Sequence, residues 1–429
     1  RRHLSLARES DVRYDLLIPP ETEAMILVEK EAELFDEVRA ALLGIVDRVQ
    51  RQKRMAFSAR LALDDDEIEL YWRLARKFVP TLYRLRGSTR PLPFVEDMAV
   101  HPDVLPDFLI RLQNVQKRHE VVASLFGHVG HGQLHVRPFF DLGNQDDVVR
   151  MERFAAELYH EVREVGGTIS GEHADGLSRT PFLRDQYGPL CEVFREVKRA
   201  FDPHGIFNPG KVVPLDAARL TDHLRPVRSV LAPSVEPETL GAVDAERDDQ
   251  PPMSGNSDQP TISLQLAWQP DEMTYAARLC NGCGSCRSQS PEVRMCPIFR
   301  FSPREEASPR AKANLVRGVL TGTLDPASLE QSEMKAVADL CVHCHQCRLE
   351  CPANVDIPRL MVEVKGAFVR TNGLGPTDSL MARIDALSGI AGRMPRVANW
   401  LLGSRTARWI MEKTLGIAQG RKLPRLATR

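Results

Sequence analysis

The chain has 429 residues, more than a single hydrophobic core usually serves, so at least two domains are expected. Its 57 Lys and Arg residues balance 58 Asp and Glu residues, and no basic block typical of a nucleic-acid-binding arm is present. No apolar run of about 18 residues occurs, so no transmembrane segment is expected. Small metabolites and other proteins are the expected partners. Because the first residue is Arg1, we expect a fragment of a longer protein.

The N-terminal half alternates strand and helix patterns. Residues 24–29 (AMILVE) are a short apolar run typical of a buried strand, and apolar residues then recur at helical spacing from Leu34 to Val49. The next predicted elements are a strand Val121–Phe126, a strand around Leu134 and Val136, a helix from Met151 to Val162, a strand Thr168–Ser170 and a helix 186–201. Residues 1–215 are therefore expected to form an α+β domain.

The composition changes after this domain. Residues 216–262 are rich in Pro, Asp, Glu and Ser and lack apolar periodicity, which predicts a flexible linker. A cysteine-rich domain is expected over 263–372, with helices at SPRAKANLVRGVL and SEMKAVADL between its cysteines. Residues 373–429 are predicted to be a basic helical extension that leads toward a further cysteine-rich domain, with its amphipathic part facing solvent or a partner rather than anchoring in a membrane.

Cysteine usage is uneven. Cys191 stands alone in the first 279 residues, on a predicted helix where it would be a small buried hydrophobe, and the other eight of nine cysteines lie between Cys280 and Cys351. Disulfides are the alternative, but cysteines separated by two residues in a long, charge-balanced chain indicate metal ligands in a reducing compartment. We therefore expect a cytoplasmic protein, at most peripheral to the inner membrane.

The eight cysteines form two motifs, Cys280-x2-Cys283-x2-Cys286-x9-Cys296-Pro297 and Cys341-x2-Cys344-x2-Cys347-x3-Cys351-Pro352. In two-cluster ferredoxins the cysteine of the distal Cys-Pro serves the other cluster. This predicts one [4Fe–4S] cluster on Cys280, Cys283, Cys286 and Cys351, and a second on Cys341, Cys344, Cys347 and Cys296. Two four-cysteine zinc sites are the alternative, but they usually pair two C-x2-C knuckles and lack the third cysteine. His343 and His345 are interpreted as loop residues.

Histidines and a glutamate gather around two glycine-rich turns. Residues 127–135 (GHVGHGQLH) place His128, His131 and His135 between two strands, and Gly171-Glu172-His173 follows another strand. Two imidazoles and a carboxylate with an open position are a common catalytic zinc set, and an adjacent unligated His can serve as a base. Hydrogen-bonded loop histidines are the alternative, and this pattern alone does not decide between them.

The segments FGHVGHGQLHVRPFFDL, GEHADG and FDPHGIFNPGK resemble the C-terminal half of FAD-linked oxidases of the vanillyl-alcohol oxidase/p-cresol methylhydroxylase type. That family includes D-lactate, glycolate and D-2-hydroxyglutarate dehydrogenases. The segments PLPFVED, CNGCGSC, MCP and SPRAKANLVRG resemble more narrowly the large bacterial D-2-hydroxyglutarate dehydrogenase group, in which the flavin enzyme is fused to iron–sulfur modules. The resemblance covers most of residues 15–372.

The resemblance implies roles for single residues. His128, His135 and Glu172 would bind a divalent metal, zinc by expectation, and His173 would be the catalytic base. Asn208 would contact the flavin from this cap (substrate) domain. The residues around it can also be interpreted as a Pro-Gly turn that ends a helix, and the two interpretations are compatible. The chain departs from the family's commoner pattern at three positions, His131, Gln133 and Ala174, which leaves the ligands intact but alters the pocket's shape.

These expectations combine into a function: flavin-dependent oxidation of a D-2-hydroxy acid, with 2-hydroxyglutarate, lactate and glycolate as candidates. Electrons would pass to two [4Fe–4S] clusters and on to a downstream protein or quinone-linked acceptor. The FAD-binding domain itself is not in these residues. Candidates for the substrate carboxylate are Arg73, Arg76, Lys77, Arg84, Arg86 and Arg90. An electron-transfer subunit without its own substrate site is the alternative, whereas a zinc hydrolase would leave eight cysteines unexplained.

Overall fold

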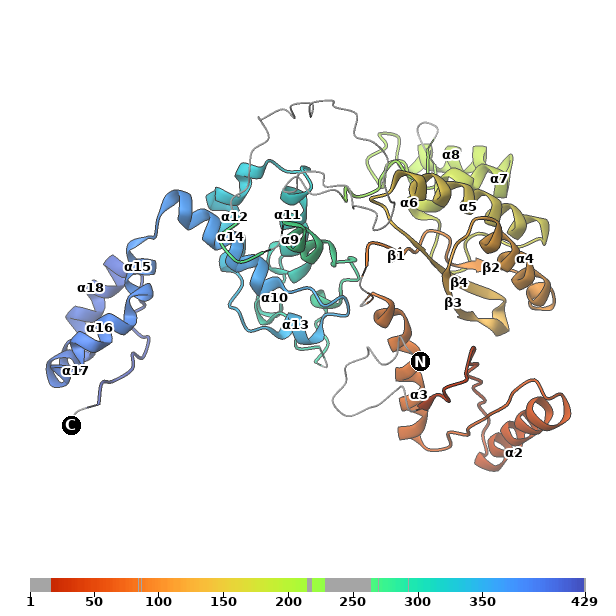
Figure 1. Cartoon of the computed structure of the whole chain (residues 1–429), viewed down its shortest axis with the longest axis horizontal. Helices are drawn as coiled ribbons and strands as arrows, with labels where there is room; N and C mark the ends of the chain where they lie inside the picture. Colours follow the sequence, from red (N-terminus) through yellow and green to blue (C-terminus); the bar gives the residue numbers. More distant parts are fainter. Residues whose placement is uncertain are drawn as a thin grey trace, which may run out of the picture. The chain divides into compact units, whose positions relative to one another are not determined.

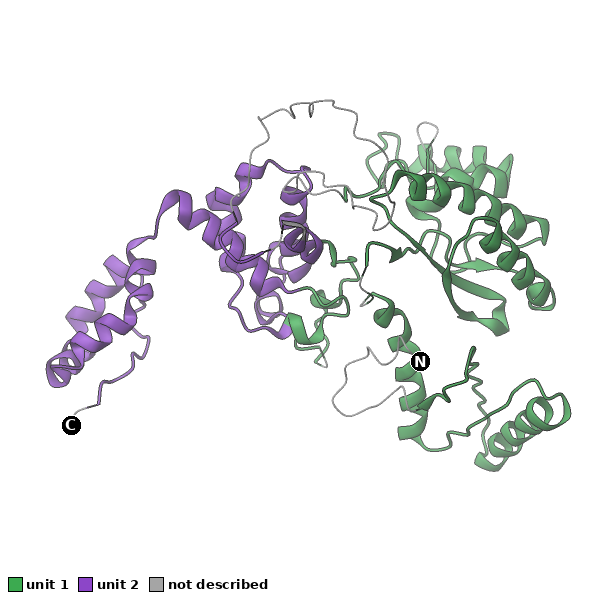
Figure 2. Cartoon of the chain, viewed as in Figure 1, with its two compact units in different colours: residues 1–228, 278–295, 347–355 green, residues 229–277, 296–346, 356–429 purple. Residues whose placement is uncertain are grey.

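The computed structural model describes residues 17–83, 85, 87–213, 218–227, 264–268, 270–291 and 293–427. Two compact units are present (Figure 2). The first comprises Arg1–Arg228, Arg278–Met295 and Cys347–Val355, and the second comprises Ser229–Ala277, Cys296–Gln346 and Asp356–Arg429. The mixture of helices with a small sheet confirms the predicted α+β class.

The sheet of the first unit is built around one long strand, β4 (Gln133–Phe140). Antiparallel to it lie β3 (Ala123–His128), β1 (Arg90–Pro91) and β2 (Met98–Ala99) (Figure 1). The β3–β4 register places Phe126 opposite His135. The strands expected around 121–126 and at Leu134 and Val136 are thus confirmed. The strand expected at Thr168–Ser170 reduces to one bridge between Thr168 and Ala99.

Side chains along β4 point alternately to two faces of the sheet: one face packs in the hydrophobic core, and the other, the chemical face, carries polar side chains. Leu134, Val136 and Phe140 belong to the hydrophobic core, together with buried side chains of α4 (Leu105–Arg118) and α5 (Gln145–Glu164). Successive side chains of a strand point to opposite faces, so His135 and Arg137 lie on the other face. The core of the unit therefore holds β4 rigidly while β4 presents polar groups to a site.

This unit contains further helices. They are α2 (Phe35–Val46), which continues as a π-helix (Asp47–Gln52), α3 (Asp65–Leu82), α6 (Gly176–Arg179), α7 (Leu183–Tyr187) and α8 (Leu190–Phe201). Short 3-10 helices occupy Pro102–Val104, Val129–His131, Thr180–Phe182 and Ser285–Arg287. The helices expected from Leu34 and from Met151 are confirmed. The helix expected over 186–201 is divided at Gly188 between α7 and α8, and α3 and α4 were not expected.

Two expectations of burial are wrong. Residues 24–29 are irregular rather than a buried strand, and Met25 and Ile26 are 49% and 71% exposed. A short apolar run has no periodicity that fixes its structure, and no strand among the described residues pairs with it. Cys191 is only half-buried, with Sγ 3.5 Å from the Leu183 carbonyl, because the apolar face of α8 is largely exposed, as at Val193.

The second unit is helical. Its core consists of buried residues from α9 (Pro270–Arg278), α11 (Pro309–Leu320), α12 (Ser332–Asp339) and α14 (Ile357–Asn372). The second unit also contains the short helix α10 (Pro297–Phe301) and 3-10 turns at Glu305–Ala307 and Pro326–Glu330, whereas α13 (Gln346–Glu350) belongs to the first unit except for Gln346. Ser308 caps α11 by accepting a hydrogen bond from the Ala311 amide at 3.0 Å. Both helices expected between the cysteines are confirmed.

The C-terminal extension is helical, as expected. It contains α15 (Pro376–Ala382), α16 (Ile384–Ala391), α17 (Pro395–Gly403) and α18 (Arg405–Leu415). In the described part of the chain, no helix combines the length and apolarity needed to cross a bilayer. Within the predicted linker, Leu220 and Leu224 pack against the core of the first unit, and residues 228–263 lie outside the described residues.

Candidate active site and cluster-binding loops

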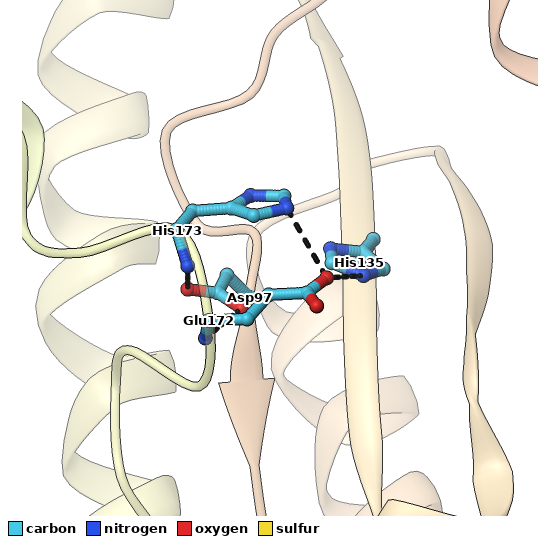
Figure 3. A group of neighbouring side chains, drawn as sticks. All are labelled: Asp97, His135, Glu172 and His173. Atoms are coloured by element: carbon cyan, nitrogen blue, oxygen red, sulfur yellow. Dashed lines mark hydrogen bonds and ion pairs between the residues drawn. The ribbon is translucent and has the colours of Figure 1, made fainter.

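A histidine–carboxylate group lies on the chemical face of β4. Glu172 Oε1 is 3.2 Å from His173 Nε2, 3.5 Å from His135 Nε2 and 3.8 Å from His128 Nε2. His135 comes from the middle of β4, His128 ends β3, and the other two lie on the loop after Thr168 (Figure 3). The β3–β4 turn needs glycine at Gly132, which has φ +68° and whose Cβ would lie 1.8 Å from the Val100 carbonyl oxygen.

Three rings stack beside this carboxylate. His135 lies between Phe126 and His173, with ring centroids 4.8 Å and 5.0 Å away. Burial lowers the pKa of His135, and the neighbouring His173 lowers it further. A lowered pKa keeps the imidazole neutral, which is the form that binds a metal. Its buried Nδ1 has no hydrogen-bond partner among the described residues.

The group fits a divalent cation. Asp97, His135, Glu172 and His173 offer ligand atoms that all lie within 4.8 Å of one another. His128, expected as a ligand, lies outside this tight group, although its ring is perpendicular to that of His135 at 5.7 Å. Imidazole nitrogens that converge on one carboxylate oxygen are the donor set typical of zinc sites. The assignment of His128, His135 and Glu172 as ligands stays a prediction.

Asp97 holds the loop that carries the glutamate and the base. Its fully buried carboxylate accepts hydrogen bonds from the Glu172 amide at 2.9 Å, the His173 amide at 2.8 Å and the Gln133 side chain at 2.6 Å. Burial would raise the pKa of Asp97, but these hydrogen bonds outweigh it and lower the pKa. Because both oxygens accept hydrogen bonds, we interpret Asp97 as the residue that positions the loop.

Two further residues escaped the sequence analysis. Glu96 Oε1 lies 3.5 Å from His173 Nδ1, and the other Glu96 oxygen forms an ion pair with Nη1 of Arg137. The Arg137 side chain is only 9% exposed, and its Cζ lies 5.7 Å from the Phe126 ring centroid. Strand alternation was the available signal, because Arg137 follows His135 by two residues and must share its face.

Six basic residues were expected to bind the substrate carboxylate, and the structure engages two of them elsewhere. Arg76 forms an ion pair with Glu69, and Arg90 donates a hydrogen bond to the Leu85 carbonyl at 2.9 Å. The Arg73 Nε is buried without a hydrogen-bond partner among the described residues, and Arg84 and Arg86 lie outside those residues. Their role, and that of Lys77, stays a prediction.

Asn208 lies in an anchored turn. It has φ +46°, and its Oδ1 accepts a hydrogen bond from Lys211 Nζ at 3.1 Å. Asp202 accepts hydrogen bonds from the amides of Ile206 and Phe207, each at 2.9 Å. A hydrogen bond from the Lys198 ammonium lowers the pKa of Asp202 to about 2. The turn expected at Asn208 is present, whereas flavin contact stays a prediction.

The first cysteine loop and Cys351 occur together in the first unit. Burial raises the pKa of the Cys351 thiol, and Cys283 and Cys280 lie close enough to raise it further. The Cys283 amide donates to Asn281 Oδ1 at 3.1 Å, which closes the loop locally. This proximity is consistent with a shared ligand set, and that set stays a prediction.

Cys296 and Cys341 are neighbours in the second unit. Burial raises the pKa of Cys341 and Cys296 raises it further, whereas Lys312 and Lys365 act in the opposite direction. Cys296 has φ +49°, and its Sγ lies 3.5 Å from the Ala307 carbonyl. The loop residue His343, with φ +52°, has Nε2 3.5 Å from Lys365 Nζ.

Comparison with known proteins assigns both parts of the chain. Residues 4–212 match the C-terminal domain of FAD-linked oxidases, and residues 267–356 match a 4Fe–4S dicluster domain. The chain therefore carries an FAD-linked oxidase C-terminal domain followed by an iron–sulfur domain, which confirms the resemblance. The dicluster match favours iron–sulfur clusters over two zinc sites.

Particular relatives extend the likeness beyond single domains. D-2-hydroxyglutarate dehydrogenase of Haemophilus influenzae is 26% identical over 90% of this chain and 38% of its own length. The protein of that name from Escherichia coli is 27% identical over 91% of this chain and 39% of its own. Glycolate oxidase subunit GlcD of Bacillus subtilis is 28% identical over 47% of this chain and 42% of its own. The chain thus spans about two fifths of the length of these relatives.

Asp97→Asn should loosen the Glu172–His173 loop, because an amide offers one acceptor oxygen where the carboxylate offers two. We expect the amides of these two residues to exchange at least roughly tenfold faster by hydrogen–deuterium exchange. The lowered pKa of Asp97 also means that its contribution to stability is complete above the ordinary value of 3.8 and is lost as the pH falls through the lower folded value.

Asp202→Asn is the matched control. Asp202 also accepts two backbone hydrogen bonds, but from Ile206 and Phe207, so only those amides should exchange faster. Wild-type exchange at Glu172 and His173 in the Asp97 variant would contradict the positioning role.

Proposed function

We propose that this chain is the substrate and electron-relay part of a flavin-dependent D-2-hydroxy-acid dehydrogenase. The observation that carries the proposal is the convergence of His128, His135 and His173 on one Glu172 oxygen. It occurs in a domain that matches FAD-linked oxidases, next in sequence to a dicluster domain. An electron-transfer subunit would need no such group. We propose that the oxidase domain spans residues 1–215, the linker 216–262, the iron–sulfur domain 263–372 and the helical extension 373–429.

His128, His135 and Glu172 would hold the divalent metal, with zinc as the expected ion. When bound, the metal would act as a Lewis acid toward the substrate's hydroxyl and carboxylate oxygens. The neutral state of His135, favoured by its burial, suits metal ligation. Asp97 accepts a hydrogen bond from the Glu172 amide and so holds Glu172 beside His135.

His173 would take the hydroxyl proton at Nε2. This nitrogen faces the Glu172 oxygen, and Nδ1 on the other side of the ring faces Glu96. The Asp97 carboxylate fixes the backbone of His173 at 2.8 Å, so the ring is held from both its backbone and its side chain. A base with such fixed orientation loses little entropy when it meets the substrate.

Arg137 supports an anionic substrate. Its guanidinium is buried on the face that carries His135, and its buried Nε donates no hydrogen bond to a described residue. A guanidinium of this kind matches the planar geometry of a carboxylate. A 2-hydroxy acid brings such a group, and 2-hydroxyglutarate brings two.

FAD, contacted by Asn208, would accept two electrons from the substrate, and two [4Fe–4S] clusters would pass them on singly to a protein or quinone-linked acceptor. We assign Cys280, Cys283, Cys286 and Cys351 to one cluster, and Cys341, Cys344, Cys347 and Cys296 to the other. The proximity of Cys351 to Cys280 and Cys283, and of Cys341 to Cys296, supports this exchange of ligands. Cluster thiolates suit the reducing cytoplasm, with contact at the inner membrane at most peripheral.

Replacing His135 or His128 by Ala, or Glu172 by Gln, should weaken zinc binding by more than the roughly 10–100-fold that outer-shell changes cost. Calorimetric titration with zinc of the 429-residue chain, with both clusters first reconstituted so that the cysteines are occupied, measures this. His101→Ala is the control, because His101 is a surface residue whose side chain is 72% exposed. Equal zinc affinity in all four variants would contradict the site.

His173→Ala should keep the metal and lose the chemical step. A base in hydrogen-bond reach contributes roughly 10²–10⁴-fold, so kcat should fall by that factor. The assay requires the full-length protein with its flavin, with D-2-hydroxyglutarate and D-lactate compared as electron donors to an artificial acceptor. Turnover at the wild-type rate would favour the electron-transfer subunit instead.

Cys351→Ser should remove the cluster bound by Cys280, Cys283 and Cys286. Iron content under anaerobic conditions should fall from about eight to about four per chain. Electron paramagnetic resonance of the reduced protein shows which signal disappears, and Cys286→Ser should remove the same one. If Cys351→Ser instead removes the signal that Cys341→Ser removes, each motif closes on itself.

A further inference from the structure

A lysine is buried in the core of the iron–sulfur domain. Lys312, near the start of α11, is 1% exposed, and its Nζ donates a hydrogen bond to the Ala307 carbonyl at 2.5 Å. Removing an ammonium from water costs several kcal/mol unless opposite charge compensates it. The proposed oxidation chemistry makes no use of this residue.

The Ala307 carbonyl connects this ammonium to a cysteine. The same oxygen lies 3.5 Å from Cys296 Sγ, so Lys312 and Cys296 share one acceptor. Lys312 also acts on Cys341, where it opposes the effect of burial. Both cysteines belong to the ligand set assigned to the second cluster. Lys312 is therefore next to that cluster's binding loops.

A second cation approaches the same loop from α14. Lys365 Nζ lies 3.4 Å from the Cys341 carbonyl and 3.6 Å from Asp339 Oδ1, and its side chain is 29% exposed. Amides and thiols act on both Cys341 and Cys351, whereas lysines are among the printed influences on Cys341 and not among those on Cys351.

We infer that Lys312 raises the reduction potential of the second cluster, with Lys365 as a weaker, partly solvent-screened contributor. The inference rests on the iron–sulfur assignment of the proposed function. A thiolate-bound cluster is negatively charged and gains one more negative charge on reduction, so a fixed buried cation stabilises the reduced state more.

The test is a potentiometric titration of the anaerobically reconstituted 429-residue chain, followed by electron paramagnetic resonance. Lys312→Gln keeps a donor for the Ala307 carbonyl but removes the charge, whereas Lys312→Arg keeps the charge. We expect the Gln variant to shift the second cluster's midpoint potential to more negative values and the Arg variant to leave it near wild type. Lys365→Gln should give a smaller negative shift. The first cluster, identified as the signal lost in Cys351→Ser, should not move in any of these variants.

Lys413→Gln is the control for surface charge, since Lys413 is exposed on α18, and it should shift neither cluster. Unchanged potentials in Lys312→Gln, or equal shifts in the Gln and Arg variants, would overturn the inference. If the Lys312→Gln variant does not assemble the second cluster, the Lys365→Gln variant becomes the test. A second-cluster potential that is unchanged in Lys365→Gln would then overturn the inference. A wild-type chain without two cluster signals would instead contradict the assignment on which it rests.

Discussion

The candidate site depends on one buried carboxylate. Asp97 gathers the amides of Glu172 and His173 and the side chain of Gln133, and thereby joins three separate chain segments at a single point. It has a left-handed φ of +68°, unusual for a residue other than glycine, which the surrounding hydrogen bonds maintain. Because β4 is fixed by the core on its other face, the histidine of the strand and the glutamate of the loop have little freedom relative to each other.

Positively and negatively charged side chains alternate around the Asp97 carboxylate. Glu96 lies between the Arg137 guanidinium and the His173 ring, and His135 is kept neutral by its burial. Each buried charge thus has an opposite charge or a hydrogen-bond donor beside it, which is the condition under which buried ionic groups persist. In the iron–sulfur domain, the buried Lys312 donates a hydrogen bond to the Ala307 carbonyl, beside cysteines that become anionic when they bind a cluster.

The sequence predicted the parts of the site that have a local pattern. Glycine-bracketed histidines and the Gly-Glu-His segment identified four site residues, and the cysteine spacing indicated the ligand sets. Asp97 and Glu96 were part of a recognised segment, but their roles depend on contacts with residues more than 70 positions away, which no periodicity reports. The prediction of a strand at residues 24–29 is wrong for the opposite reason: the local apolar pattern is present, but no described strand pairs with this segment.

The interleaved division of the chain bears on biosynthesis. Cys351 belongs to the first unit, yet all of Cys296–Gln346 must be synthesised before it emerges from the ribosome. The oxidase domain can therefore fold early, while its neighbouring cysteine loop stays one thiolate short until the second unit is largely made. With the ligand exchange that we assign, neither cluster can be completed from one motif alone. Both clusters can then be completed only after Cys351 has been synthesised, late in the synthesis of the iron–sulfur domain.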